Sequence, residues 1–283
     1  MRKQKIKLVT ETLFGIIDKV KIAIDRLQQF EPPEGYYLAF SGGKDSQMIY
    51  HLALEAGVKF DAHYNLTTVD PPELVRFIKD NYPDVVIEKP RATMWELIVK
   101  NGVPPTRLQR YCCRELKEKG GENRMSITGV RWAESFRRSK TRAMLEKFGK
   151  DKILFNDNDD TRKMIDICQL KSKRILNPII DWEDGEVWDY LNLRKIKHCE
   201  LYDQGYYRLG CIGCSMGSKE QRLRQFARWP KYYQAYLRTF DRMLAQRERR
   251  GKTTKWKTAQ DVMDWWIYEM PKADPDQLEL FEN

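Results

Sequence analysis

The sequence predicts an α/β fold, a doubly wound parallel sheet that is followed by a helical, basic C-terminal region. Short apolar runs alternate with amphipathic runs between residues 31 and 185, which is the pattern of strands and helices in a parallel sheet. Beyond residue 185 the composition becomes basic and aromatic. We therefore expect an N-terminal helix over 1–30, a sheet domain over 31–185 and a helical region over 186–283.

The apolar runs and their stop signals place the elements of the sheet domain. We expect strands at 36–40, 60–66, 85–88 and 126–130, helices at 45–56, 73–81 and 94–100, and a linker at 177–182 leading to a helix that starts near 184–186. Ligands bind such sheets beyond the carboxyl ends of the strands. The segments 41–46, 67–70 and 129–131 all follow strand ends, so we expect them to form one site.

The segment Ser41–Ser46 reads SGGKDS and joins the first expected strand of the sheet to a helix. Glycines allow the backbone to turn sharply and to approach a ligand closely. The unpaired amides that begin the helix favour an anion. An ordinary turn with Ser or Asp as the N-cap is the alternative. Two glycines, a lysine and two serines together favour a phosphate site.

The net charge of +10 is concentrated in one segment of the chain. Lys219–Lys257 holds 13 Lys or Arg against 3 Asp or Glu, a surplus of 10, so the other residues sum to zero. Such a segment suits a polyanion, although a solvated helix face is the simpler alternative. It also contains aromatic residues that could stack on bases or pack in a core: Phe226, Trp229, Tyr232, Tyr233, Tyr236 and Trp256. We predict nucleic acid as a partner.

The cysteines predict a metal or cluster site. The six are Cys112, Cys113, Cys168, Cys199, Cys211 and Cys214. The adjacent pair and the C-x-x-C pair supply four thiolates, which fit zinc or a four-iron cluster. Neighbouring cysteines strain around one zinc ion but can occupy two corners of a cubane. The remaining two lack partners at ligand spacing and are expected to be small buried hydrophobes.

The N-terminal residues are basic and then helically amphipathic. They contain no apolar block followed by a cleavage site, so they do not predict a signal peptide. No run approaches the roughly 18 apolar residues that a membrane span needs. We expect a cytoplasmic protein without membrane contact, in which disulfides are not the default use of cysteine.

Several segments resemble a known family in the order in which they occur. Ser41–Ser46 resembles the pyrophosphate-binding loop (PP-loop) of the adenine nucleotide alpha hydrolases. Gly129–Ser135 with Arg138 resembles the second motif of the phosphoadenosine phosphosulfate (PAPS) reductase family within that group. The family's later landmarks are similar to Asn177–Ile179, the EVWDYL helix, Tyr202–Gly205 and Arg208–Cys214. The resemblance covers roughly residues 30 to 225.

The resemblance implies an adenine nucleotide whose phosphates or sulfate lie in the loop. Lys44 would supply charge, Asp45 would orient the loop or help to hold Mg²⁺ with ATP, and Arg131 would clamp a charged oxygen bidentately. These three are the catalytic candidates. Glu134 would contact the ligand or pair with Arg138. The candidate nucleotide-binding residues are Ser41, Gly42, Gly43, Lys44, Asp45, Ser46, Thr68, Gly129 and Arg131.

The cysteine pattern resembles that of the iron–sulfur adenosine phosphosulfate (APS) reductases. This resemblance implies a [4Fe-4S] cluster, with zinc as the alternative, on four ligands: Cys112, Cys113, Cys211 and Cys214. Lys117 matches a lysine that lies beside the cluster in those enzymes.

Two departures separate the sequence from the sulfonucleotide reductases. Those enzymes attack sulfur with a cysteine on a C-terminal tail, whereas here no cysteine follows Cys214 and residues 274–283 are acidic. Residues 67–70 read TTVD and not the Asp-Thr-Gly typical of reductases. The first hypothesis is therefore an enzyme that splits ATP to AMP and pyrophosphate to activate a nucleic acid for sulfur transfer. It would be similar to the PAPS-reductase-like ATPases of DNA phosphorothioation or the cluster-bearing tRNA thiolases.

Two alternatives stay open. The first is an APS or PAPS reductase that uses an external or rearranged thiol such as Cys199. The second is a non-catalytic subunit that binds nucleotide and nucleic acid within a larger assembly. A sulfur-donor protein is a further expected partner under the first hypothesis.

Overall fold

A computed structural model describes residues 8–13, 15–118, 120–121, 123–147, 153–155 and 174–269. The chain divides into two compact units. The sheet unit comprises Met1–Tyr64, Glu73–Ile87 and Gly120–Leu209, and the helical unit comprises Asn65–Pro72, Glu88–Lys119 and Gly210–Asn283. The units interleave along the sequence, so they differ from a division at residue 185.

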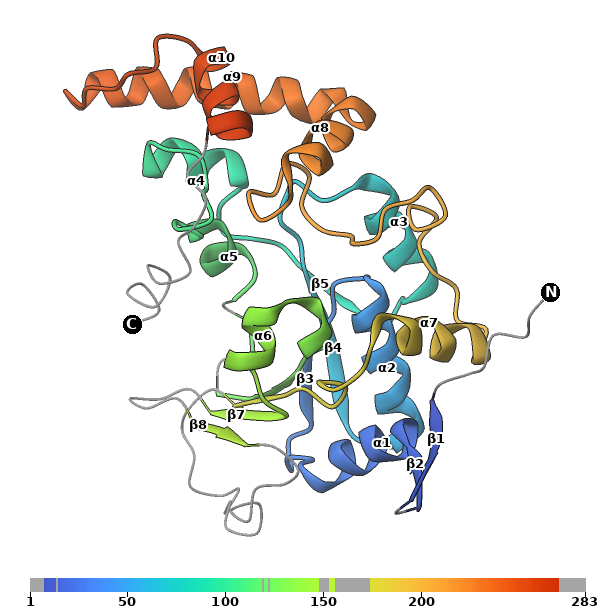
Figure 1. Ribbon diagram of the computed structural model, residues 1–283. Helices are drawn as coiled ribbons and strands as arrows, with labels where there is room; N and C mark the ends of the chain where they lie inside the picture. The colour runs from blue at the N-terminus through green and yellow to red at the C-terminus, as the bar shows by residue number, and fades with distance from the viewer. Residues whose placement is uncertain are drawn as a thin grey trace. The chain divides into compact units, whose positions relative to one another are not determined.

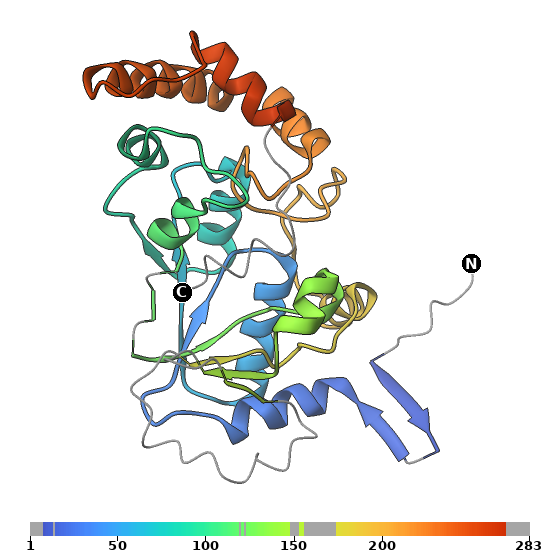
Figure 2. The same ribbon diagram turned by 60° about the vertical axis from the view of Figure 1, so that its left-hand side comes forward.

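The N-terminal part of the sheet unit is a hairpin followed by a helix (Figure 2). Strands β1 (Val9–Thr12) and β2 (Gly15–Asp18) pair antiparallel, and α1 spans Lys19–Gln29. The prediction of helix is wrong for residues 9–18, because β-branched residues on either side of a glycine at φ +124° favour a hairpin. Asp18 starts the helix by accepting from the amides of Val20 and Lys21.

The central sheet has the strand order β5-β4-β3-β6-β9-β7-β8 in the described residues (Figure 1). Its strands are β3 (Tyr36–Ala39), β4 (Phe60–Asn65), β5 (Val86–Glu88), β6 (Met125–Ile127), β7 (Leu145–Lys147), β8 (Ile153–Phe155) and β9 (Arg174–Leu176). Strand β3 is parallel to β4 and β6, and β6 is parallel to β9. Strand β7 is antiparallel to β8 and β9, so the predicted parallel sheet is confirmed at its centre but not at this edge.

The helices of the sheet unit confirm the predicted alternation. They are α2 (Lys44–Ala56), α3 (Pro72–Asn81), α6 (Phe136–Thr141) and α7 (Asp184–Leu193), with a 3-10 turn at Trp132–Glu134. Helix α2 packs against α1 and α7, and its buried side chains meet the apolar strand β3 in the core. The strand-to-helix junction that carries SGGKDS is therefore anchored on both sides by buried elements.

The helical unit confirms the predicted helical C-terminal region. It contains α4 (Met94–Asn101), α5 (Tyr111–Leu116), α8 (Lys219–Arg228), α9 (Pro230–Arg249) and α10 (Ala259–Asp264), followed by a π-helical turn at Trp265–Glu269. Proline at the first position of α9 costs no hydrogen bond. None of the described helices is both long and apolar enough to cross a membrane.

Most aromatic residues of the basic segment belong to the core of the helical unit. Phe226, Trp229 and Tyr236 are buried, and Phe226 and Tyr236 pack against Trp266. Tyr232 donates its hydroxyl hydrogen to the carbonyl of Asp70. Of the two expected uses of the aromatic residues, packing in a core applies to Phe226, Trp229 and Tyr236, so these rings are not free to stack on bases.

Candidate functional site

The SGGKDS loop takes a fixed shape from its own residues. Gly42 has φ +71°, and a Cβ there would lie 2.7 Å from a side chain of α3, so only glycine fits. The hydroxyl of Ser46 accepts from the Ser41 amide at 3.1 Å and donates to the Gly43 carbonyl at 2.9 Å. These two hydrogen bonds fix the turn at the start of α2, where the N-cap residue Gly43 has no side chain to cap the helix.

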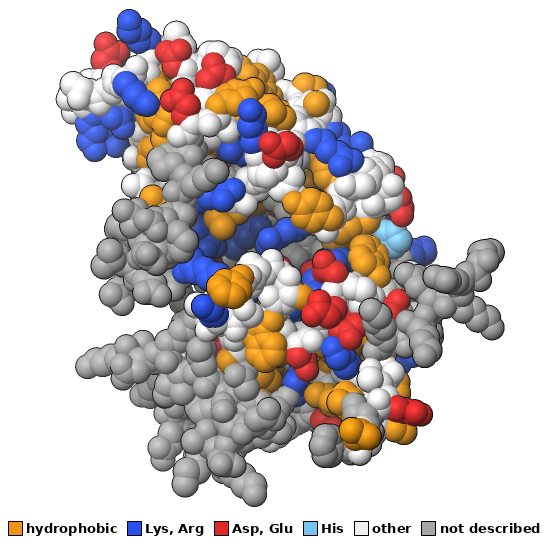
Figure 3. Space-filling model, in the orientation of Figure 1, with side chains coloured by type: hydrophobic (Ala, Val, Ile, Leu, Met, Phe, Trp, Pro, Cys, Tyr) orange, Lys and Arg blue, Asp and Glu red, His pale blue; other side chains and the backbone are white. Residues whose placement is uncertain are grey.

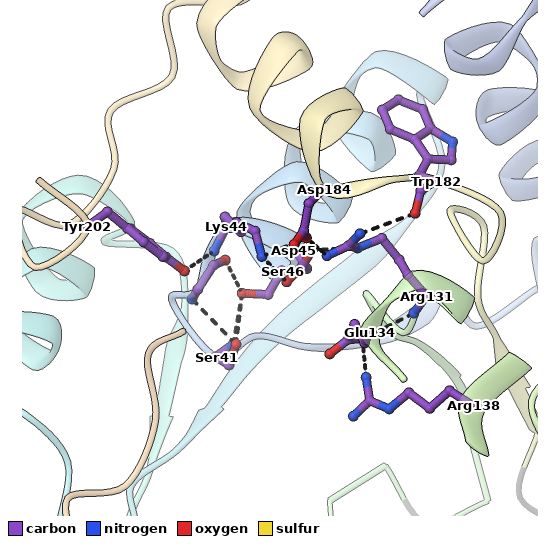
Figure 4. A network of polar contacts seen from close by, with 11 residues as sticks. Ser41, Lys44, Asp45, Ser46, Arg131, Glu134, Arg138, Trp182, Asp184 and Tyr202 are labelled. Atoms are coloured by element: carbon purple, nitrogen blue, oxygen red, sulfur yellow. Dashed lines mark hydrogen bonds and ion pairs between the residues drawn. The ribbon is translucent and has the colours of Figure 1, made fainter. Parts of the chain in front are cut away.

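A network of two cations and two carboxylates lies at the loop (Figure 4). Arg131 follows β6 and is 1% exposed; its Nε lies 2.8 Å from Asp45 Oδ1, and its Nη1 donates to the Trp182 carbonyl at 3.1 Å. Its Nη2 donates to the Asp184 carboxylate. The Nζ of Lys44 lies 3.4 Å from Asp45 and 3.3 Å from Asp184. Each carboxylate thus bridges both cations.

The electrostatics of this network keep the charges in place. Burial opposes the ionisation of Asp184, but the Arg131 guanidinium and the Lys44 ammonium outweigh it and lower the pKa of Asp184. Burial likewise opposes the charge of Arg131, and Asp45 and Asp184 outweigh it and raise its pKa. The formal charges cancel. An incoming anion must therefore compete with carboxylates for the two cations, or arrive with a cation that takes the carboxylates over.

Gly129 explains how Arg131 reaches the loop. A Cβ at Gly129 would lie 2.8 Å from the Cβ of Asp45 and 2.9 Å from its backbone carbonyl carbon. Because glycine has no side chain, the segment after β6 can lie directly against the first turn of α2. The predicted meeting of the first and last strand-end segments is therefore present in the sheet unit.

Two residues of this site were missed by sequence reasoning. Asp184, at the start of α7, supplies the second carboxylate, and Tyr202 accepts a hydrogen bond from the Lys44 amide at 2.8 Å. Burial raises the pKa of Tyr202, so its hydroxyl is neutral and keeps a hydrogen that it can donate. Tyr202 lies in a segment that carries the family resemblance and Asp184 at an expected helix start, but the pattern could not show that either side chain points to the loop.

A group of arginines lies near the loop. Glu134 forms an ion pair with Arg138, which was one of the two roles expected for it. It also accepts a hydrogen bond from the Arg131 amide. Burial lowers the pKa of Arg138, and the positive charges of Arg208 and Arg142 lower it further. Guanidinium groups so close to one another favour an anionic ligand.

The remaining predicted nucleotide contact, Thr68, belongs to the helical unit. Its Oγ1 accepts from the Met94 amide at 3.0 Å and so caps the start of α4. Thr68 has a positive φ of 68°, which this hydrogen bond stabilises. The cap is a structural role, and the nucleotide contact of Thr68 stays a prediction.

The four thiols of the two cysteine pairs come together in the helical unit. Cys112 and Cys113 lie on α5, Cys211 and Cys214 lie on a turn before α8, and all four are partly exposed. They are close enough to act on one another electrostatically. The pKa of Lys117 is raised, first by Cys211 beside it and then by the other charges of the group. The lysine that the resemblance singled out therefore faces the thiols.

The C-x-x-C turn is rigidly held. Gly213 has φ +75°, and a Cβ there would lie 2.7 Å from the ring of Phe226. The Gly213 amide donates to the Gln225 side chain at 2.9 Å, and the Ile212 amide donates to the Val69 carbonyl at 2.7 Å. The two sulfurs are thus presented by a turn that cannot easily rearrange.

Residues 35–216 match the profile of the phosphoadenosine phosphosulfate reductase domain, which is more than half of the chain. The chain belongs to this family. It is 29% identical over 177 residues to an adenosine 5'-phosphosulfate reductase of Oceanobacillus iheyensis, covering 60% of this chain and 63% of the relative. An adenosine 5'-phosphosulfate reductase of Staphylococcus epidermidis is 27% identical, with 74% of this chain and 71% of the relative covered.

An uncharacterised protein of Methanocaldococcus jannaschii is 27% identical over 212 residues, which cover 69% of this chain but 40% of that protein. The alignments cover 40% of the length of this relative and 63% of the length of the Oceanobacillus iheyensis enzyme, so the chain spans less than two thirds of each of these two. A solved phosphoadenylyl-sulfate reductase of Candida auris, in a phosphate complex, aligns with a TM-score of 0.44 at 17% identity. That alignment covers 67% of this chain and 87% of the Candida auris chain.

The cysteines of this PAPS reductase family member can be tested against the group that the pattern implies. Among the described residues, no three or more His, Cys, Asp or Glu side chains are placed to hold a single metal ion. Thiolates around a four-iron cubane stand further apart than those around one zinc ion. Lys117 and Arg110 lie beside the four thiols and suit an anionic group there, and the choice between a cluster and zinc stays a prediction.

The two other cysteines of this family member have different outcomes. Cys199 is fully buried, and burial raises the pKa of its thiol, so the prediction of a buried hydrophobe is confirmed. Cys168 lies outside the described residues.

Proposed function

We propose that this protein binds ATP at the SGGKDS loop and splits it to AMP and pyrophosphate to activate a nucleic acid for sulfur transfer. The family membership supports an enzyme that acts on a sulfonucleotide or a related adenine nucleotide. The choice of ATP rests on one observation, the pair of carboxylates Asp45 and Asp184 at the phosphate loop.

The carboxylate pair suits a nucleotide that arrives with a divalent cation. Mg²⁺ binds carboxylates and phosphate oxygens together, and ATP carries it. Asp45 and Asp184 would hold this ion, which when bound neutralises charge on the phosphates. A sulfonucleotide reductase attacks sulfur with a thiolate and has no comparable need for two carboxylates at the loop.

The loop would bind the nucleotide by an exchange of ion-pair partners within the network. When the carboxylates turn to the cation, Lys44 and Arg131 are released to the phosphate oxygens. Arg131 then offers two parallel N–H donors, and Lys44 offers a point charge. The Tyr202 hydroxyl, already on the Lys44 amide, can donate to a further phosphate oxygen.

The reaction needs positioning and charge neutralisation more than acid–base chemistry. A substrate oxygen attacks the α-phosphorus, its proton passes to solvent, the bond from the α-phosphorus to the bridging oxygen breaks, and pyrophosphate leaves with that oxygen. Lys44 and Arg131 stabilise the negative charge that grows on the leaving group. The product is an adenylylated acceptor from which a sulfur nucleophile displaces AMP.

The helical unit would supply the sulfur-handling and acceptor-binding parts. Cys112, Cys113, Cys211 and Cys214 would hold a [4Fe-4S] cluster, which when bound offers iron to an incoming sulfur atom. The basic segment would bind the nucleic acid by its phosphates. A sulfur-donor protein would complete the reaction.

Reduction of APS or PAPS is the second candidate, and the curated relatives named adenosine 5'-phosphosulfate reductase favour it. It requires a nucleophilic thiolate. Cys199 does not provide one, because its thiol is buried and its pKa is raised. An external thiol would have to take this part.

Anaerobically purified protein should be assayed for pyrophosphate release from Mg-ATP, with and without DNA or tRNA, and for sulfite release from APS and PAPS with a thiol reductant. We expect pyrophosphate release that Lys44→Ala abolishes and that requires a divalent cation. Sulfite release without pyrophosphate release would establish the reductase. Nucleotide binding with neither product would establish the non-catalytic subunit.

A further inference from the structure

Helix α9 is the longest described helix of the helical unit (Figure 1). Four of its basic residues are spaced so that they form a straight row along it. They are Lys231, Arg238, Arg242 and Arg249, spaced by seven, four and seven residues. At about 100° per residue these spacings place all four within about 20° of one line, and at 1.5 Å per residue the row is about 27 Å long. We call them the α9 row.

The α9 row lies opposite the face of α9 that packs in the core. Tyr236, Phe240 and Met243 are buried, and their positions lie roughly 120–180° around the helix from the row. All four cations are exposed, and in the described part of the chain none of them forms an ion pair. Arg242 acts on Glu96 at longer range only. The row is therefore open to an external partner.

The acidic residues of the helix do not interrupt the row. Asp241 and Glu248 are exposed but lie roughly 80–100° to one side of it. A face that served only for solubility would mix both signs, with acids three or four residues from bases to form ion pairs. In Figure 3, side chains of both signs are exposed on the visible face of the molecule. The row instead presents one sign of charge at regular intervals.

We propose that the α9 row binds the phosphate backbone of a double-helical nucleic acid, without reading its bases. This inference rests on the proposed function for its biological role but not for the binding itself. A straight row of fixed cations matches a regular polyanion, which carries about one charge per 1.7 Å of duplex axis. Contacts to phosphates position a protein on a duplex and carry no sequence information.

The neighbouring residues favour a duplex over a single strand. Proteins that hold single strands combine charge with aromatic platforms on which bases stack. Phe226, Trp229 and Tyr236 are buried in the core, and no exposed large apolar residue lies on α9. An anionic membrane is disfavoured for the same reason, because interfacial helices insert apolar side chains that α9 has turned inward.

The test compares two variants with equal net charge. The row variant carries Gln in place of Lys231, Arg238, Arg242 and Arg249. The control variant carries Gln in place of four exposed lysines of the sheet unit: Lys21, Lys59, Lys79 and Lys197. Full-length protein is titrated by fluorescence anisotropy into a duplex of about 20 base pairs, in DNA and RNA forms, and into the single strand, over a range of salt.

We expect parent and control to bind the duplex alike and more tightly than the single strand. The row variant should bind at least about tenfold more weakly, with a salt slope shallower by about 3.6 if each cation neutralises one DNA phosphate. The proposal is overturned if the row variant binds like the parent, if the control loses as much, or if the single strand binds best. The DNA and RNA arms identify the duplex.

Two further measurements keep the outcome clear. Thermal unfolding checks that the row variant folds; if it does not, the double variant Arg238→Gln/Arg242→Gln replaces it, with Lys59→Gln/Lys79→Gln as its control. Affinity for Mg-ATP, measured by calorimetry, should be the same in parent and row variant. Duplex binding with no ATP turnover would leave this inference standing while the proposed function fails.

Discussion

The PP-loop network of the sheet unit and the thiol group of the helical unit differ in how their charges are balanced. Each gathers charged or ionisable groups from segments far apart in sequence. At the loop, Lys44 and Arg131 are neutralised by Asp45 and Asp184. In the thiol group, the four sulfurs act on one another, Lys117 and Arg110 lie beside them, and Cys211 contacts the Thr67 hydroxyl.

This difference determines how a ligand would interact with each group. The loop network is complete without a ligand, so a ligand must exchange partners within it. Neighbouring thiols oppose one another's ionisation, and the proposed cluster would supply the positive charge that offsets this repulsion.

Loss of one thiol should remove the proposed cluster entirely. We expect anaerobically purified parent protein to contain iron and sulfide and to show a broad brown absorbance, and Cys214→Ser to lose all three. Cys199→Ser is the control, because this buried cysteine lies outside the group and should keep the parent spectrum. Stoichiometric zinc in a colourless parent would show that the group takes a single metal ion instead.

Loss of Arg131 should destabilise the sheet unit strongly. The guanidinium is 1% exposed and has Asp45, Asp184 and Trp182 as partners, so Arg131→Ala leaves the Trp182 carbonyl unpaired beside a cavity and leaves Asp45 with Lys44 alone. Removing one partner of buried hydrogen-bonded groups costs about 1–3 kcal/mol for each group left unpaired. Urea unfolding measures it.

Arg138→Ala is the matched control, since the Arg138 side chain is 29% exposed, pairs with Glu134 and is repelled by Arg208 and Arg142. It should cost clearly less than Arg131→Ala. Equal losses in the two variants would mean that the loop network does not hold the fold together.

Local patterns predict the loop but not its partners. SGGKDS and the strand before it are contiguous, so periodicity and glycine chemistry identify them. Asp184 and Tyr202 join the loop only through tertiary packing, and a carboxylate at a helix start has an ordinary capping explanation.

The strands that were missed and the role of the aromatic residues were likewise not visible in local sequence patterns. Strands β7, β8 and β9 have three residues each, as β5 and β6 do, but they lie outside the strand–helix alternation that identified those two. Aromatic residues at helical spacing give the same sequence pattern whether they pack in a core or face a ligand. Phe226 and Tyr236 pack in the core. Charge is different, because burial of unpaired Lys or Arg is so costly that a basic row must be exposed.

The two units should differ in their response to acid. In the sheet unit, Arg194 lowers the pKa of Glu55 and Arg124 lowers the pKa of Asp61 by hydrogen bonds that join separate elements. A folded-state pKa below the unfolded value gives stability that is present above about pH 4 and is lost as pH falls through the lowered value.

In the helical unit, the carboxylates of lowered pKa are Glu96, Glu220 and Asp261, which accept hydrogen bonds within the first turns of their own helices. Their protonation frays helix starts and breaks no contact between elements. Hydrogen exchange between about pH 5 and pH 3 should therefore show loss of protection in β4 and α7 before α9. Simultaneous loss in both units would contradict this contrast.

The smallest expected effect concerns the Tyr202 hydroxyl. Tyr202→Phe removes its hydrogen bond to the Lys44 amide and leaves the ring in place, so stability should fall by about 1 kcal/mol. Affinity for Mg-ATP should fall by more than this loss explains if the hydroxyl also donates to a phosphate oxygen. Tyr207→Phe is the control, since Tyr207 is exposed and makes no hydrogen bond among the described contacts. A Tyr202→Phe protein that is less stable but binds Mg-ATP like its parent would limit Tyr202 to shaping the loop, and the phosphate would then depend on Lys44 and Arg131 alone.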